Sequence, residues 1–119
     1  MPYNILIADD EFLIRWSLKQ VLIQDGHHVV TAEDGQKAIE AGRTTFFDFV
    51  ITDIFMPESD GWHVLDAFSK CQPSTRVIIM TAYGEGELGR VAKEKGAFAY
   101  VEKPYLIQRI KDILRETST

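Results

Sequence analysis

Four short apolar runs in the chain end at polar residues whose side chains could act together on a phosphoryl group. In chain order these residues are Asp9-Asp10-Glu11, Asp53, Thr81 and Glu102-Lys103. Short apolar runs are typical of strands buried on both faces of a parallel sheet. Ligands and reacting groups gather at the carboxyl ends of such strands, so we expect these side chains to converge on one edge. Carboxylates, a hydroxyl and an amine at one edge predict a divalent-metal site around a carboxylate that accepts phosphate.

The three aspartates predict a cation, because carboxylates held close together repel one another. Two unit charges about 5 Å apart cost roughly 3 kcal/mol at an effective dielectric constant of about 20. A ligand set made only of oxygen favours Mg²⁺, with Mn²⁺ as the alternative. Asp10 also has a simpler interpretation, as the cap of a helix that begins at Glu11. The presence of Asp53 and Lys103 at corresponding strand ends favours the metal site.

Asp53 is the candidate phosphate acceptor. A carboxylate is a poor nucleophile toward phosphorus unless charge is neutralised and the attack is held in line. The metal ion and Lys103 would neutralise the phosphoryl group from two sides, and Thr81 could donate a hydrogen bond to a third oxygen. Taken singly, a threonine at a strand end and a lysine in a loop are ordinary. Together they make a complete phosphoryl-binding set.

Apolar runs alternate with helical patterns about five times, which is typical of an α/β domain with right-handed crossovers. The predicted strands cover residues 4–8, 28–32, 48–52, 76–80 and 98–101, and the predicted helices cover 11–24, 35–43, 61–70, 86–95 and 105–116. Gly26, Gly42 and Gly96 lie where helices are expected to end in a left-handed cap. A strand order of 2-1-3-4-5 would bring the acidic pair and Asp53 to the switch point of the sheet.

Composition predicts one globular domain covering residues 1–119. The chain is 45% hydrophobic and 26% charged, and its net charge of −5 argues against direct nucleic-acid binding by this domain. The single Cys71 cannot form an internal disulfide, and we expect it to pack as a small apolar residue. Neither a signal peptide nor an apolar stretch of 18 residues is found, so we expect a cytoplasmic location with no membrane association.

These motifs resemble those of two-component response-regulator receiver domains, similar to the stand-alone chemotaxis and sporulation-relay types. The motifs are Asp9-Asp10-Glu11, Asp53-Ile54-Phe55-Met56-Pro57-Glu58-Ser59-Asp60-Gly61, Met80-Thr81-Ala82 and Tyr100-Val101-Glu102-Lys103-Pro104. The resemblance spans nearly the whole chain. It implies a flavodoxin-like (βα)5 three-layer sandwich around a five-stranded parallel sheet in the order 2-1-3-4-5.

The resemblance also implies roles and partners. Asp53 would take phosphate from a sensor histidine kinase or phosphotransfer protein, and Lys103 would contact the phosphoryl group. The implied Mg²⁺ ligands are Asp10 directly, Asp9 through water, Asp53, and the main-chain carbonyl of Phe55. The signal would pass to a downstream effector protein or to a fused output domain, and the sequence leaves open whether the domain stands alone. The domain would promote only its own phosphorylation and dephosphorylation.

A switch follows from the same resemblance. Thr81 would move toward the phosphate and Tyr100 would rotate inward, remodelling the surface of the fourth helix, fifth strand and fifth helix. Tyr100 could instead be a strand aromatic that is always packed. The glycines in Gly84–Gly89 predict a frayed start of the fourth helix, or a loop that needs positive φ. A cis peptide is expected before Pro104.

Two further features have alternative interpretations. Phe55 and Tyr83 could screen the acyl phosphate from water, or Phe55 could simply pack on its loop. The first helix carries more apolar residues than one buried stripe needs, namely Phe12, Leu13, Trp16 and Ile23 in addition to Ile14, Leu18, Val21 and Leu22. The extra residues could dock a kinase or phosphotransfer helix, or pack against the fifth helix through Ile107, Ile110 and Leu114.

Three rival functions fit the residues less well. Phosphatases of the haloacid-dehalogenase type need an acid two residues after the nucleophile, where this chain has Phe55, which cannot transfer a proton. They also place the acidic pair after the lysine. A flavin or nucleotide binder would need a glycine-rich loop where Asp9-Asp10-Glu11 stands. An interaction module that is never phosphorylated would not need the complete set of phosphoryl-binding residues that this chain carries.

Overall fold

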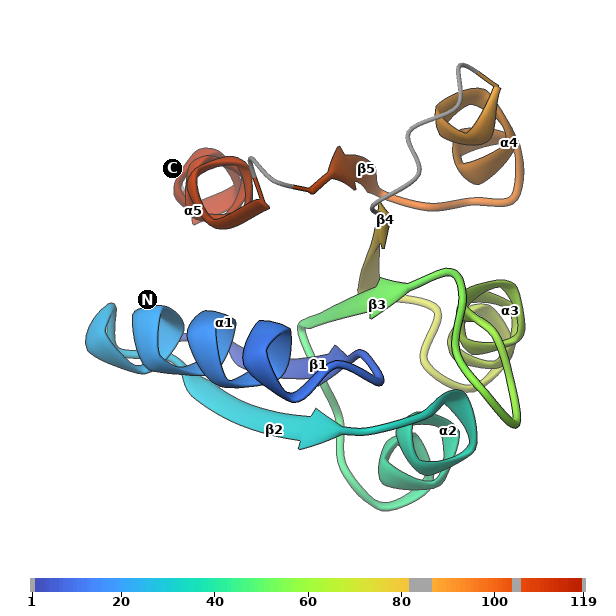
Figure 1. Ribbon diagram of the computed structural model, residues 1–119, viewed down its shortest axis with the longest axis horizontal. Coiled ribbons are helices and arrows are strands. Elements are labelled where there is room, and N and C mark those ends of the chain that lie inside the picture. Colours follow the sequence, from blue (N-terminus) through green and yellow to red (C-terminus); the bar gives the residue numbers. More distant parts are fainter. Residues whose placement is uncertain (1, 82–86, 104–105, 119) are drawn as a thin grey trace.

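The computed structural model describes residues 2–81, 87–103 and 106–118 as alternating strands and helices (Figure 1). The strands are β1 (Asn4–Ala8), β2 (His28–Ala32), β3 (Phe49–Asp53), β4 (Arg76–Thr81) and β5 (Ala99–Glu102). The helices are α1 (Phe12–Gln24), α2 (Gly35–Thr44), α3 (Gly61–Cys71), α4 (Leu88–Glu94) and α5 (Leu106–Ser118). All strand pairs are parallel and the order is β2-β1-β3-β4-β5, so the predicted flavodoxin-like fold is confirmed.

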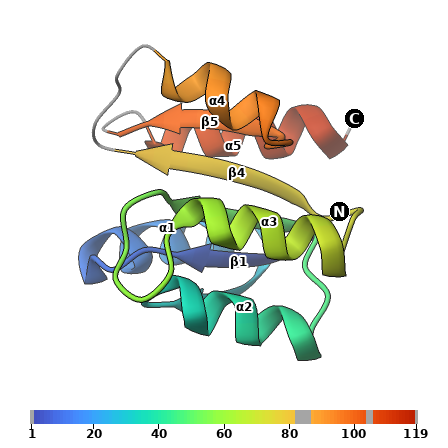
Figure 2. The same ribbon diagram turned by 90° about the vertical axis from the view of Figure 1, so that its right-hand side faces the viewer.

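The sheet is the middle of three layers. Helices α1 and α5 cover one face, and α2, α3 and α4 cover the other (Figures 1 and 2). Side chains of β1 alternate between the two faces: Ile5 and Ile7 pack with α1 and α5, whereas Leu6 and Ala8 pack with α2 and α3. Every residue of β3 is buried, as expected for the central strand of a sheet that is covered on both faces.

Predicted and observed strand ends agree to within one residue. The fourth helix, predicted over 86–95, is observed as α4 over Leu88–Glu94. Several expectations lie outside the described residues: Tyr83, the glycines at 84 and 86, and the peptide before Pro104.

The glycine predictions were right at two of three positions. Gly26 and Gly96 have φ angles of +95° and +99°, the left-handed conformation expected after α1 and α4. The prediction for Gly42 was wrong, because α2 continues through it to Thr44. A Cβ on Gly42 would lie 2.6 Å from Cζ of Phe68 in α3, so this glycine permits close packing of the two helices.

The apolar surplus of α1 is exposed to solvent. Leu18 and Leu22 are buried against the sheet together with side chains of α5. The exposed fractions of the surplus side chains are 63% for Phe12, 71% for Leu13, 52% for Trp16 and 45% for Ile23. Packing of these four against α5 was therefore a wrong interpretation. Among the described residues, no helix is long and apolar enough to cross a membrane.

Candidate functional site

Strand register brings the predicted site residues to one edge of the sheet. Ala8 of β1 pairs with Thr52 of β3, so the next residue of each chain segment, Asp9 after β1 and Asp53 at the end of β3, lies at the same level of the sheet. Thr81 pairs with Glu102, which places Lys103 one residue beyond the end of β4. The polar residues far apart in sequence therefore meet at the carboxyl ends of β1, β3, β4 and β5.

Asp9 is held rigidly between β1 and α1. Its side chain is fully buried, and Oδ1 accepts a hydrogen bond from the main-chain N–H of Glu11 at 2.9 Å. Nη1 of Arg15 donates to the main-chain oxygen of Asp9 at 2.8 Å. No pattern in the sequence indicates this role for Arg15, because the contact depends on how the first turn of α1 lies over the end of β1.

The capping interpretation of Asp10 was wrong. The N-cap residue of α1 is Glu11, whose side chain makes no capping hydrogen bond. The N–H of Glu11 donates to Oδ1 of Asp9. Asp10 remains exposed, and the carboxylates of Asp9, Asp10 and Asp53 each offer an oxygen that lies within 4.8 Å of the others. The three carboxylates thus form a cluster that is open to solvent on the side of Asp10.

Asp53 is the last residue of β3, and only 6% of its surface is exposed. Oδ1 accepts a hydrogen bond from the N–H of Phe55 at 3.4 Å, and Oδ2 lies 3.3 Å from Nζ of Lys103. Gly61 also shapes this position, because a Cβ there would lie 2.3 Å from the main-chain oxygen of Asp53. The start of α3 can approach the end of β3 this closely only without a side chain.

Lys103 joins the two buried carboxylates. Its Nζ lies 2.9 Å from Oδ2 of Asp9, 3.3 Å from Oδ2 of Asp53 and 3.5 Å from Oε1 of Glu11. Its main-chain N–H donates to the carbonyl oxygen of Thr81 at 2.8 Å, which fixes the lysine at the edge of the sheet. Burial alone would lower the pKa of Lys103, but the hydrogen bond to Asp9 and the charges of Asp53 and Asp9 raise it overall. The raised pKa favours the protonated, positively charged amine.

One ammonium does not balance the acidic cluster. Burial raises the pKa of Asp9 and of Asp53, although hydrogen bonds and the charge of Lys103 act in the opposite direction. Asp10 adds a third carboxylate to the same cluster. The unbalanced charge and the purely oxygen donor set fit a hard divalent cation such as Mg²⁺.

The two predicted switch residues lie on neighbouring strands. Thr81 is fully buried at the end of β4. Tyr100 of β5 is half-buried against α4, where a Cβ on Gly89 would lie 3.2 Å from its ring atom Cδ2. The Tyr100 hydroxyl is buried without a hydrogen-bond partner among the described residues, and burial raises its pKa. The ring of Tyr100 thus has an inward arrangement and packs against α4.

Phe55 lies beside the carboxylates with 53% of its surface exposed. Its N–H faces Asp53, and its side chain remains at the surface near the cluster. An aromatic side chain in this place leaves the described site without the second acid that an aspartate-based phosphatase would need.

Comparison with known proteins decides between the families that could carry such a site. The family described as the response regulator receiver domain matches residues 5–115 of the chain. The chain belongs to this family. The receiver domain is 34% identical over 116 residues to sporulation initiation phosphotransferase F of Bacillus subtilis, and the match covers 98% of this chain and 94% of that protein.

Other relatives are longer. The transcriptional regulatory protein PdtaR of Mycobacterium tuberculosis is 37% identical over 110 residues, which are 90% of this chain and 52% of that protein. Among solved structures, the receiver domain is similar to the CheX-CheY-BeF3-Mg²⁺ complex from Borrelia burgdorferi. The TM-score is 0.91 at 28% identity, covering 100% of this chain and 91% of that chain. Receiver domains of this family thus occur both nearly alone and as half of a larger regulator.

Proposed function

We propose that this receiver domain accepts a phosphoryl group on Asp53 and passes the signal on through a change of its surface. The observation that carries the proposal is the contact of one partly buried ammonium, Lys103, with two buried carboxylates, Asp53 and Asp9, at 3.3 and 2.9 Å. Receiver-family membership supports the same function.

In the transfer step, a carboxylate oxygen of Asp53 attacks phosphorus of a phosphohistidine on the donor protein. An O–P bond forms, the N–P bond breaks, and the imidazole nitrogen leaves with the electron pair. Lys103 stabilises the negative charge on the phosphoryl oxygens, and the N–H of Phe55 orients the attacking carboxylate. Because the carboxylate is held by β3 and α3, little reorganisation is needed for an in-line approach.

Asp10 and Asp9 are the proposed metal-holding residues, together with Asp53 and the main-chain carbonyl of Phe55. When bound, Mg²⁺ would supply positive charge next to the phosphoryl oxygens. Asp10 is exposed, so a hydrated cation can reach its carboxylate from solvent. Asp9 is buried, and its carboxylate already accepts hydrogen bonds from Lys103 and from the N–H of Glu11. This difference supports direct coordination by Asp10 and a water-mediated role for Asp9. The solved relative in complex with Mg²⁺ supports the choice of ion.

Thr81 and Tyr100 are the proposed switch. The phosphoryl group adds negative charge and acceptor oxygens next to the end of β4, and the Thr81 hydroxyl would donate to one of them. The inward arrangement of Tyr100 leaves its hydroxyl without a partner among the described residues, which costs free energy. We infer that phosphorylation stabilises this arrangement and so changes the surface formed by α4, β5 and α5.

The proposed donor is a sensor histidine kinase or phosphotransfer protein in the cytoplasm, and the exposed side chains of α1 are its docking surface. Phe12, Leu13 and Trp16 lie on the first turns of α1, directly after the acidic pair. An apolar patch beside the reacting carboxylate suits a helix that carries the phosphohistidine. The proposed recipient is an effector protein or a fused output domain, because relatives include both short and long regulators.

The test is incubation with Mg²⁺ and acetyl phosphate, followed by intact-mass measurement. We expect one added phosphoryl group in the wild type, and none in Asp53→Asn or after removal of the metal with EDTA. Asp66→Asn is the matched control, because Asp66 is an exposed aspartate in α3 that pairs only with Lys70 at the surface among the described residues. No metal-dependent adduct from acetyl phosphate or from a kinase would contradict the proposal.

A further inference from the structure

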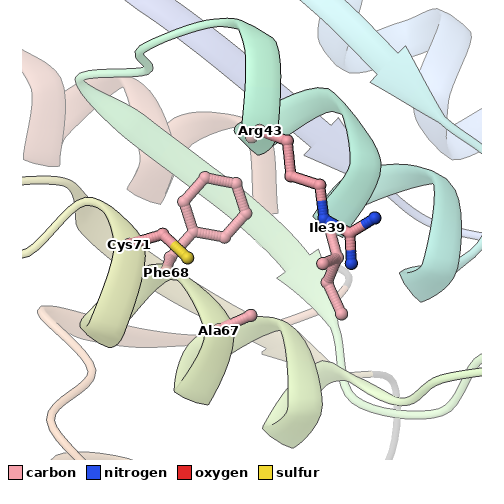
Figure 3. A pocket seen from close by; sticks show the side chains of 6 residues that line it. Ile39, Arg43, Ala67, Phe68 and Cys71 are labelled. Carbon is pink, nitrogen blue, oxygen red and sulfur yellow. The ribbon is translucent and has the colours of Figure 1, made fainter.

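A second concave site lies between α2 and α3, at the ends of these helices opposite to the carboxylate cluster. Its volume is about 160 Å³. The lining residues are Ile39, Gly42, Arg43, Ala67, Phe68 and Cys71. Figure 3 shows Ile39 and Arg43 on α2 facing Ala67, Phe68 and Cys71 on α3. Asp53 precedes the amino end of α3, whereas Cys71 is its last residue, so the two sites are separate.

The small side chain of Ala67, a single methyl group, leaves space on α3. Gly42 lets the ring of Phe68 lie directly against α2, where it lines the pocket. Phe68 is buried and forms an aromatic wall, while Ile39 provides an aliphatic one. An apolar cavity of about 150 Å³ accepts a benzene molecule. The pocket between α2 and α3 is therefore large enough for a single aromatic ring.

The rim of the pocket carries a positive charge. The Arg43 guanidinium has no ion-pair or hydrogen-bond partner among the described residues, and its side chain is exposed. A planar guanidinium binds a carboxylate through two parallel hydrogen bonds. We propose that this pocket binds a small aromatic carboxylate of the size of benzoate. The ring packs between Phe68 and Ile39, and the carboxylate pairs with Arg43. The proposal is independent of phosphate acceptance at Asp53.

Cys71 differs from its sequence-based prediction and can report whether the pocket is occupied. The prediction that it packs as a small apolar residue was wrong, because α3 ends at Cys71 and this residue is exposed at the rim of the pocket. Cys71 is the only cysteine of the chain, so a thiol reagent labels this place alone. An occupied pocket covers the thiol, and the rate of labelling therefore reports occupancy.

The experiment is a titration of the ¹⁵N-labelled protein with benzoate, followed by amide chemical shifts and by the labelling rate of Cys71. We expect saturable shifts at the lining residues and slower labelling. Benzyl alcohol tests the ring without the charge, and acetate tests the charge without the ring. Arg43→Gln should weaken benzoate binding about tenfold, whereas the matched control Arg109→Gln, an exposed arginine of α5, should not change it.

A variant that fills the pocket gives a second test. Ala67→Leu should abolish the shifts and the protection of Cys71 while circular dichroism shows a folded chain. Should this variant fail to fold, Arg43→Gln at the surface still decides the question. The proposal is overturned by shifts that lie elsewhere, by equal binding of benzyl alcohol and benzoate, or by benzoate binding that Arg43→Gln leaves unchanged. Phosphorylation of Asp53 is measured separately by mass, so none of these outcomes bears on the proposed phosphate acceptance.

Discussion

Removing the charge of Asp53 should stabilise the metal-free protein. In the cluster, Asp53 faces two carboxylates with oxygens within 4.8 Å, and each repels it by about 3.5 kcal/mol at an effective dielectric constant of about 20. The Lys103 ammonium at 3.3 Å attracts it by about 5 kcal/mol on the same scale. The balance leaves about 2 kcal/mol of repulsion, part of which solvent screens at the exposed Asp10.

We therefore expect Asp53→Asn to raise the free energy of unfolding by about 1–2 kcal/mol in EDTA at low ionic strength. Asparagine keeps an oxygen that can accept the N–H of Phe55, so the local geometry survives. The assay is urea unfolding followed by circular dichroism. The control Asp66→Asn, which removes a surface ion pair, should change stability by no more than about 0.5 kcal/mol.

In saturating Mg²⁺, the wild type should become more stable than Asp53→Asn. A cation bound only to the folded state stabilises it by about 2.7 kcal/mol at one hundred times its dissociation constant. The wild type should show this gain, and Asp53→Asn, which lacks one ligand, should show much less. The reasoning is refuted if the variant is no more stable than wild type in EDTA, or if Mg²⁺ stabilises both proteins equally.

Three further predictions concern the surroundings of the site and the opposite end of the sheet. Gly61→Ala should lower the free energy of unfolding by about 2–3 kcal/mol, because its Cβ would lie 2.3 Å from the main-chain oxygen of Asp53; a loss below about 0.5 kcal/mol in urea unfolding would contradict this. Phe55→Asn should shorten the lifetime of phosphorylated Asp53 several-fold, since an exposed aromatic ring no longer screens the acyl phosphate; equal decay of phosphoprotein in both proteins after donor removal would argue against screening. Burial lowers the pKa of His27, whose Nδ1 accepts the N–H of Tyr3, so the unfolded chain binds a proton more readily than the folded chain. Stability should therefore fall as pH drops below about 6.5, and His27→Gln should reduce this fall in the urea midpoint.

Local patterns in the sequence were enough to predict the elements and the edge at which the site lies. Apolar runs that end at Asp9, Asp53 and Thr81 predicted buried parallel strands, and each strand was found within one residue of its expected range. Parallel strands place their carboxyl ends together, so the meeting of the carboxylates with Lys103 followed from topology alone. These inferences succeed because they depend on the order of elements and not on the direction of any side chain.

Contacts between elements were decided only by the tertiary structure. Gly42 was expected to end a helix, yet it permits close packing of α2 on Phe68, which no local pattern distinguishes from a cap. The same holds for Arg15 on the carbonyl of Asp9 and for the exposed thiol of Cys71. The sequence by itself determined which polar groups share an edge, through the period of the strands and the topology of a parallel sheet. Distances, burial and the pocket between α2 and α3 depend on how helices pack, and packing is a property of residues distant in the chain.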